Sequence, residues 1–316
     1  MKRRNFIKNS MLAAGAMSMA SLEKLAASTG VNVYDNATAS TLAPEIREAS
    51  QSAFKKAIMW GSVGMEGSVL DKCKAIKAAG FDGIEPNSHM DRKEVLAAMQ
   101  ETGLLASDVC NSKHWNLLLS SPDKAIRRQG IEAMIVAMED AKAYGTDAVL
   151  LVPGRVDENV TYEECWKRST DGIWQLLPVA QELKVKICIE NVWNNFLMSP
   201  MEARTYIDQF GSPFVGSYFD CGNILAFGWP EQWLKILGTR VGRIHIKEYS
   251  KSVADKAGRS AGFNVPLTEG EVRWKEVMQQ ARNSYNGVWL TTEQGSSKSL
   301  AELKDLSSRL DKILAM

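Results

Sequence analysis

The chain has 316 residues, a formal net charge of +1, 45% hydrophobic residues and 24% charged residues. This composition excludes a disordered, collagen-like or coiled-coil protein, and the length suits one large domain or two small ones. The small net charge supplies no basic field for nucleic acid, and no apolar run reaches the ~18–20 residues of a membrane-spanning helix. Five widely spaced cysteines without a CxxC pair predict buried thiols rather than disulfides or a cysteine-rich zinc site.

The N-terminal segment has the features of an export signal. Four basic residues lie within positions 2–8, and a run of small and apolar residues follows over positions 11–20. This order is typical of a secretory signal, and the adjacent Arg3 and Arg4 resemble the twin-arginine motif. We expect residues 1–30 to be a twin-arginine signal peptide, residues 31–54 an N-terminal tail, and the protein to be exported to the periplasm. The alternative is an amphipathic basic helix on a cytoplasmic protein.

From residue 55 onward, short apolar runs alternate with longer segments of helical periodicity. The expected strands are 56–60, 83–86, 105–110, 148–153, 186–191, 215–221, 243–248 and 288–293. The expected helices lie near 67–79, 91–101, 123–144, 161–183, 200–210, 230–237, 271–284 and 298–314, and residues 249–270 are expected to form a long loop. Such alternation indicates parallel strands with helical crossovers, and eight units in about 250 residues match an α/β fold of the (β/α)8 TIM-barrel type.

We therefore expect residues 55–316 to form a single-domain TIM barrel. A doubly wound open sheet is the main alternative, and it usually carries a glycine-rich phosphate loop after its first strand. The segment Gly61–Gly67 follows the first expected strand, but its spacing matches neither GxGxxG nor GxxxxGK[ST]. The phosphate-loop interpretation is correspondingly weak.

The last four expected strands each carry an ionisable residue near the C-terminal end, namely Glu190, Asp220, His245 and Glu293. In a TIM barrel, the C-terminal ends of the strands meet at the face where active sites lie. Three carboxylates packed together would repel one another unless a cation lay between them. Oxygen ligands with one imidazole suit one divalent metal ion, with Mn²⁺, Mg²⁺ or Co²⁺ favoured and Zn²⁺ as the alternative. Singly, each residue is better explained as a surface carboxylate or a hydrogen-bonded histidine, and it is the occurrence of all four on successive strands that favours the metal site.

Several short motifs in residues 55–316 resemble those of the xylose isomerase-like TIM-barrel superfamily. They are Gly-Phe-Asp-Gly-Ile-Glu (80–85), Ile-Glu-Asn (189–191), Phe-Asp-Cys-Gly-Asn (219–223), Ile-His-Ile-Lys-Glu (244–248), Glu-Gly-Glu-Val-Arg-Trp (269–274) and Thr-Glu-Gln-Gly (292–295). This superfamily includes ketose 3-epimerases, hydroxypyruvate isomerases, inosose dehydratases and endonuclease IV. The resemblance implies that the four strand-end residues bind the metal. It also implies that Glu190 and Glu293 act as an acid/base pair on opposite faces of the substrate.

Three positions depart from the epimerase pattern. Asn223 stands where those enzymes usually have a histidine, Phe196 where they often have a second glutamate, and Lys251 where they often have an arginine. The metal ligands are thus retained, whereas the residues around the sugar differ. The three histidines of the whole chain are too few for the three-metal site of the endonuclease branch.

The resemblance implies a divalent-metal-dependent sugar isomerase or epimerase that abstracts a proton next to a carbonyl, through an enediolate. Because phosphorylated sugars are scarce outside the cytoplasm, we expect a non-phosphorylated sugar as substrate. The alternatives are a metal-dependent lyase or hydratase acting on a 3-oxo-glycoside or inosose, and a non-catalytic carbohydrate-binding barrel. Barrels of this family often associate through their outer helices, which suggests a homodimer or homotetramer.

Five further residues are candidates for contact with the substrate. His114 and Trp115 follow the third expected strand, where they could bind a hydroxyl and stack on a sugar ring. Lys247 points the same way as His245 by strand alternation, Glu85 ends the second expected strand, and Asn223 follows Asp220. Glu85 could also support a metal ligand from behind instead of contacting the substrate. Structural roles in packing or ion pairing are the alternative for each. Candidates for apolar walls are Trp193, Phe196, Phe227 and Trp229.

Overall fold

A computed structural model describes residues 54–316 of the chain, so the expected signal peptide and nearly all of the expected tail lie outside the described residues. Its strands form one parallel sheet in the order β3-β2-β1-β9-β8-β7-β6-β5-β4. Their bounds are β1 Lys55–Met59, β2 Gly83–Glu85, β3 Leu105–Ala106, β4 Val109–Cys110, β5 Ala148–Leu151, β6 Lys186–Glu190, β7 Val215–Asp220, β8 Val241–Ile246 and β9 Trp289–Thr292. The two strands at the ends of this order, β3 and β4, are separated by two residues of chain, so the sheet curls into a nearly closed barrel. The predicted TIM barrel is confirmed.

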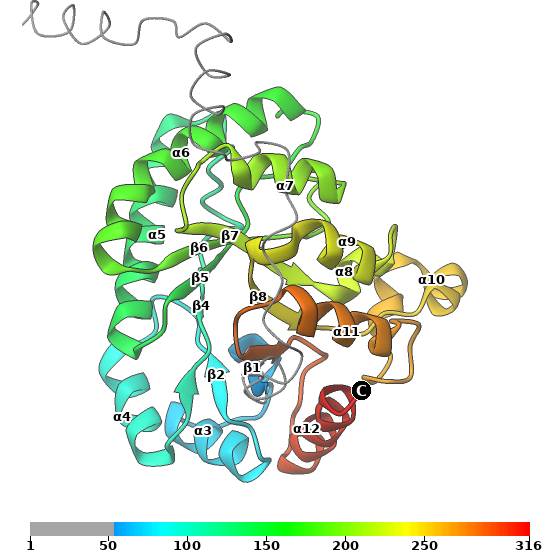
Figure 1. Cartoon of the computed structure of the whole chain (residues 1–316). Coiled ribbons are helices and arrows are strands. Elements are labelled where there is room, and N and C mark those ends of the chain that lie inside the picture. The colour runs from blue at the N-terminus through cyan, green and yellow to red at the C-terminus, as the bar shows by residue number, and fades with distance from the viewer. Residues whose placement is uncertain (1–53) are drawn as a thin grey trace, which may run out of the picture. The chain divides into compact units, whose positions relative to one another are not determined.

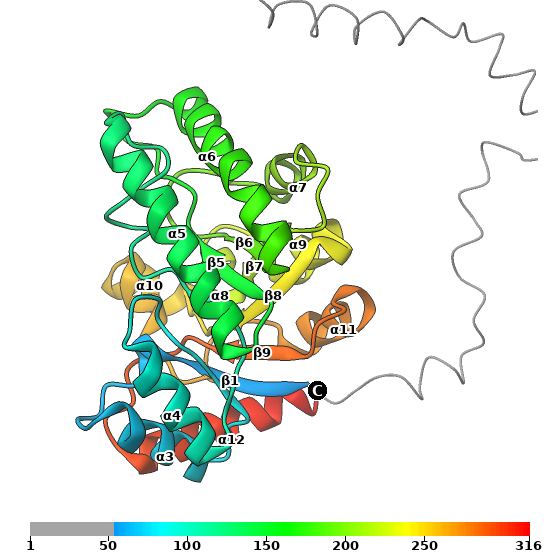
Figure 2. The ribbon, with the colours of Figure 1, turned by 90° about the vertical axis from the view of Figure 1, so that its left-hand side faces the viewer.

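Helices cover the outside of the barrel, as Figures 1 and 2 show. Their bounds are α3 Val69–Ala78, α4 Arg92–Thr102, α5 Lys124–Tyr144, α6 Tyr162–Leu183, α7 Pro200–Asp208, α8 Cys221–Leu225, α9 Pro230–Leu237, α10 Lys251–Ala257, α11 Trp274–Ser284 and α12 Leu300–Leu314. Short 3-10 turns occupy Trp60–Ser62 (η1), Gly238–Arg240 (η2) and Arg259–Phe263 (η3). Among the described residues, none of the helices has the length and apolarity required to cross a membrane.

Local sequence signals explain where several helices begin and end. Ser68, Thr161 and Ser199 precede α3, α6 and α7, and each side chain accepts a hydrogen bond from the backbone N–H three residues later. This interaction satisfies one of the N–H groups left free at a helix start. Gly145 ends α5 with a φ of 77°, a left-handed conformation that glycine adopts without steric cost.

Apolar side chains pack in two separate regions. The large core lies between the sheet and the helices, and it contains Ile58, Ile84 and Ile187. A smaller cluster includes Cys110, Leu150 and Cys188 and lies on the opposite face of the strands, inside the barrel. Buried polar side chains share that interior, since the hydroxyl of Tyr218, a member of this cluster, donates to Glu85.

The expected strand at 105–110 is instead two short strands, with Ser107 and Asp108 between them. The Ser107 backbone carbonyl accepts hydrogen bonds from Arg243 Nε at 2.9 Å and Thr146 Oγ1 at 2.8 Å. Side chains therefore donate to the Ser107 carbonyl in place of the backbone of a neighbouring strand. The chain pairs with β2 before this point and with β5 after it.

The region after β8 also differs from the expectation. The expected strand 243–248 begins two residues earlier and ends at Ile246, so Lys247 and Glu248 lie just beyond the ladder. The following residues, treated as a long loop on sequence grounds, contain α10 and η3. This segment reaches the mouth of the barrel and contributes to the site described below.

Candidate active site

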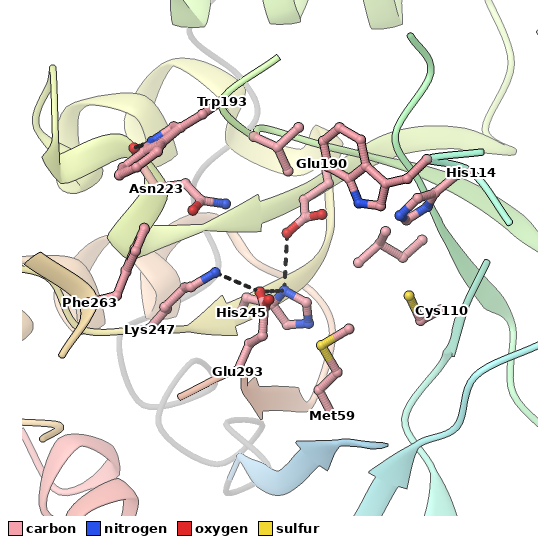
Figure 3. A pocket seen from close by; sticks show the side chains of 13 residues that line it. Met59, Cys110, His114, Glu190, Trp193, Asn223, His245, Lys247, Phe263 and Glu293 are labelled. Carbon is pink, nitrogen blue, oxygen red and sulfur yellow. Dashed lines mark hydrogen bonds and ion pairs between the residues drawn. The ribbon is translucent and has the colours of Figure 1, made fainter. Parts of the chain in front are cut away.

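Four consecutive strands deliver one ionisable side chain each to the same end of the barrel. Glu190 and Asp220 are the last residues of β6 and β7, His245 is the penultimate residue of β8, and Glu293 directly follows β9. One ligand atom from each of these residues lies within 4.8 Å of all the others. The structure thus brings together the four residues that the strand ends predicted, as Figure 3 shows for three of them.

His245 lies at the centre of this cluster. Its Nδ1 atom is 3.3 Å from Glu190 Oε1, 3.2 Å from Glu293 Oε2 and 3.9 Å from Asp220 Oδ2. Burial opposes the charged imidazolium, but Glu85 and the carboxylates around Nδ1 outweigh it and raise the pKa of His245 well above its usual range. In the absence of another cation, the imidazolium therefore supplies positive charge to this group.

Lys247 supplies a second positive charge from the same face of the chain. Its Nζ atom is 3.1 Å from Glu293 Oε2 and 3.7 Å from Asp220 Oδ2. Burial opposes ionisation of Glu293, but Lys247 and His245 together prevail and lower the pKa of that carboxyl. Glu293 is thus held as a carboxylate.

The other two carboxyls of the cluster, Glu190 and Asp220, are less well neutralised than Glu293. Burial is the main cause that raises the pKa of Glu190 and raises the pKa of Asp220 to about 7, with neighbouring carboxylates adding to it. Asp220 Oδ1 accepts the Asn223 backbone N–H at 2.6 Å, whereas Oδ2 is buried without a hydrogen-bond partner. A buried acceptor without a partner is costly, and a metal ion would satisfy it. The three carboxylates and one imidazole fit a single divalent ion.

The cluster forms part of the wall of a cavity of ≈ 230 Å³ that opens at the end of the barrel. Four of the five candidate substrate residues, His114, Trp115, Asn223 and Lys247, line it. Trp193 also lines it, whereas Phe196 packs in a buried cluster with Tyr162, Trp166 and Tyr206. Phe227 and Trp229 are exposed and do not line the cavity.

Glu85, the fifth candidate, lies deeper in the barrel than the cavity. Its side chain is fully buried inside the barrel and does not line the cavity. Its carboxylate accepts hydrogen bonds from His245 Nε2 at 2.7 Å and from Tyr218 Oη at 2.9 Å. Of the two roles expected for Glu85, contact with substrate or support of a metal ligand, the structure shows the contact with a candidate metal ligand.

His114 and Trp115 are held differently at the cavity wall. The Val152 backbone N–H donates to His114 Nδ1 at 3.4 Å, and burial lowers the pKa of His114 to about 4. His114 is thus a neutral imidazole at pH 7, with its Nε2–H free to donate. The Trp115 ring meets the His114 ring edge-on at 5.6 Å and is 44% exposed, which leaves indole surface for a ligand.

Several lining residues were missed by sequence reasoning. Met59, Cys110 and Leu150 come from strands β1, β4 and β5, and their apolar side chains gave no chemical signal. Phe263 comes from η3, in the segment expected to be a loop, and its ring lies 4.9 Å from that of Trp193. The aromatic residue within that long insertion was the available signal.

Comparisons with known proteins assign the chain to a family. Residues 73–313 match the family described as xylose isomerase-like TIM barrel, so the chain belongs to this family. L-ribulose-5-phosphate 3-epimerase UlaE of Escherichia coli O1:K1 is 26% identical over 258 residues, covering 75% of this chain and 87% of that protein.

Solved structures are similar at lower identity. The 3-keto-D-glucoside 4-epimerase YcjR from E. coli superposes with a TM-score of 0.69 at 16% identity, covering 83% of this chain and 100% of the other. D-psicose 3-epimerase from Clostridium cellulolyticum H10 gives a TM-score of 0.67 at 16% identity, covering 82% and 98%. At this level of identity these likenesses concern the fold.

Proposed function

We propose that this protein is a divalent-metal-dependent sugar epimerase or isomerase that abstracts a proton next to a carbonyl and proceeds through an enediolate. The observation that carries this proposal is the cluster of Glu190, Asp220, His245 and Glu293, of which Glu190, His245 and Glu293 line the barrel-mouth cavity. The relatives named above as epimerases support the same class of reaction.

The roles of the residues follow from their positions. The ion would be held by Glu190, Asp220, His245 and Glu293. When bound, it would withdraw electron density from adjacent carbonyl and hydroxyl oxygens of the sugar. Glu190 and Glu293 lie on non-adjacent strands, so their carboxylates can approach a substrate carbon from different sides. One removes the proton and the other returns one to the opposite face, which inverts that carbon.

Two cavity residues would assist this proton transfer. Lys247 Nζ lies beside Glu293 and can donate a hydrogen bond to a substrate oxygen on which negative charge develops. His114 presents a neutral imidazole, which suits it to orient a hydroxyl rather than to supply a proton. Trp115 and Trp193 offer aromatic surface to the ring of the sugar.

A non-phosphorylated sugar is the substrate class that we propose. Of the residues that line the cavity, Lys247 is the one with a permanent positive charge, and its ammonium is engaged with Glu293 and Asp220. Three aromatic side chains, Trp115, Trp193 and Phe263, occupy positions around the same cavity. UlaE is named for a phosphorylated substrate, so sugar phosphates are the comparison to be made.

A second candidate function is elimination from a 3-oxo-glycoside or inosose. Asn223 and Phe196 replace a histidine and a glutamate of the epimerase pattern, and Asn223 lies in the cavity wall. YcjR, named for a 3-keto-glucoside, supports the use of an oxidised glycoside as a probe. The third hypothesis is a carbohydrate-binding barrel without activity, in which Glu190 and Glu293 would transfer no proton.

The test is incubation of the Mn²⁺-loaded protein with neutral ketoses, 3-oxo-glucosides and ketose phosphates in D₂O. An epimerase incorporates one deuterium and yields an isomer that differs in mass only by that deuterium, whereas a lyase releases an aglycone or water. Glu293→Gln is the matched variant, because it keeps the size of the side chain and removes the base. Turnover of phosphorylated sugars alone would contradict the substrate class, and no exchange with any probe would favour the binding protein.

We also propose export by the twin-arginine route and assembly as a homodimer or homotetramer. Arg3, Arg4 and the apolar run after them support export. Fractionation of cells expressing the wild type and an Arg3→Lys/Arg4→Lys variant tests it, since only the wild type should reach the periplasm. Light scattering on the purified protein tests the assembly, and a monomer would contradict it.

A further inference from the structure

We propose that Glu85 is a positioning residue that determines which nitrogen of His245 faces the metal ion. This inference rests on the metal site proposed above and adds a residue from the opposite side of the barrel. Glu85 belongs to β2 and His245 to β8, and two strands, β1 and β9, separate them in the sheet. The contact between them therefore spans the barrel interior.

The two nitrogens of His245 have different partners. Nε2 lies 2.7 Å from Glu85 Oε2, whereas Nδ1 faces Glu190 Oε1 at 3.3 Å and Glu293 Oε2 at 3.2 Å. Figure 3 shows the His245 ring with one nitrogen directed to Glu190 and Glu293. A neutral histidine carries its proton on one nitrogen, and the other is then the metal ligand.

Glu85 is suited to hold that proton on Nε2. Its side chain is fully buried, and a carboxylate is a strong acceptor for an N–H group. With Nε2 protonated, the Nδ1 lone pair is directed into the cluster of Glu190, Asp220 and Glu293. Carboxylate partners of this kind fix the orientation of metal-binding histidines and increase their basicity.

Tyr218 holds Glu85 in turn. Its hydroxyl donates to the same Glu85 Oε2 at 2.9 Å, and its ring lies 4.3 Å from the His245 ring. Tyr218 belongs to β7, the strand that ends in Asp220. The hydroxyl and the imidazole therefore hold Glu85 Oε2 between the two rings, whereas Oε1 is buried without a hydrogen-bond partner among the described residues.

The experiment measures binding of MnCl₂ by calorimetry to the metal-stripped wild type and to Glu85→Gln, Glu85→Met and Tyr218→Phe. All three substitutions keep nearly the volume of the original side chain. Glu85→Met removes the acceptor and should weaken binding by about 10- to 100-fold. Glu85→Gln retains a carbonyl oxygen for Nε2–H, and Tyr218→Phe retains the carboxylate, so each should have a smaller effect.

A second readout distinguishes positioning from general destabilisation. In ¹⁵N-histidine-labelled protein loaded with Zn²⁺, only three histidines give signals, and the His245 Nε2 proton should exchange slowly with water. Glu85→Met should accelerate that exchange. Glu248→Gln is the matched control, because Glu248 is also a fully buried carboxylate but bonds to the segment after β8 instead of to His245.

Three outcomes would overturn the inference. The first is Mn²⁺ binding by Glu85→Met with the wild-type affinity, and the second is an equal loss of affinity in Glu248→Gln. If Glu85→Met does not fold, wild-type affinity and wild-type proton exchange in both Glu85→Gln and Tyr218→Phe would overturn it as well. A wild type that binds no divalent metal would overturn the metal site of the proposed function together with the inference.

Discussion

Substitution of Lys247 by methionine should lower the stability of the metal-free protein and raise its affinity for a divalent metal ion. The ammonium lies 3.1 Å from Glu293 Oε2 and 3.7 Å from Asp220 Oδ2, in the position of a cation that neutralises two carboxylates. A divalent ion in the cluster would use the same two carboxylates. Lys247→Met should therefore destabilise the metal-free protein and strengthen its binding of metal.

The magnitudes follow from the distances. At an effective dielectric constant of ~20, the Lys247–Glu293 separation of 3.1 Å corresponds to about 5 kcal/mol of attraction before desolvation is subtracted. Removing one partner of a buried pair typically costs about 3–5 kcal/mol, which for a domain of this size lowers the Tm by roughly 6–12 °C. Loss of the neighbouring positive charge should tighten Mn²⁺ binding by on the order of tenfold, or ~1.4 kcal/mol.

The assay is a thermal melt of wild type and variant across a Mn²⁺ titration, with the affinity measured separately by calorimetry. Lys251→Met is the control, because Lys251 stacks on Trp229 at 4.5 Å and has no ion pair among the described residues. Its melting temperature and Mn²⁺ affinity should stay near those of the wild type. Weaker Mn²⁺ binding by Lys247→Met, or an unchanged melt without metal, would refute the competition between lysine and metal for these carboxylates.

Three further predictions concern the other buried groups. His245→Ala removes a candidate ligand, so it should weaken Mn²⁺ binding, measured by calorimetry, by more than the roughly 10- to 100-fold that is typical for residues behind a ligand, and wild-type affinity would exclude it as a ligand. Because burial lowers the pKa of His114 to about 4, the unfolded chain binds a proton that the folded protein excludes as pH falls from 6.5 to 4. Stability should therefore decline in that window by on the order of 3 kcal/mol. Urea unfolding should show that His114→Asn reduces this decline more than His89→Asn does, because burial also lowers the pKa of the exposed His89. Glu248 accepts hydrogen bonds from three backbone N–H groups and the Trp274 indole. Glu248→Gln should therefore lower the free energy of unfolding by about 2 kcal/mol and increase amide exchange across residues 249–273. Unchanged amide exchange would contradict the role of Glu248 in anchoring this segment.

The four candidate metal ligands were predictable because of where they lie in their strands. In a parallel barrel, the C-terminal strand ends share one face, so Glu190, Asp220 and Glu293 needed only the correct strand assignment to be placed together. Lys247 was predictable for a related reason. Side chains two residues apart in a strand point the same way, and His245 precedes it by two.

The position of Glu85 could not be read in the same way. The sequence shows that it ends an apolar run, but its partner His245 is 160 residues away and separated from it in the sheet by two strands. Whether such a side chain reaches a ligand or the substrate depends on the stagger and closure of the barrel. The interruption of the strand at Ser107 could not be predicted either, because the Ser107 carbonyl accepts a hydrogen bond from Arg243, which lies 136 residues further along the chain.

By itself, the sequence determined the alternation of strands and helices and the residue types at the strand ends. These features depend on local periodicity along the chain. Only the tertiary structure decided that Glu85 lies behind His245, that Phe263 reaches the cavity and that the strand at 105–110 is interrupted. Those outcomes depend on contacts between distant segments, which form only when the barrel closes.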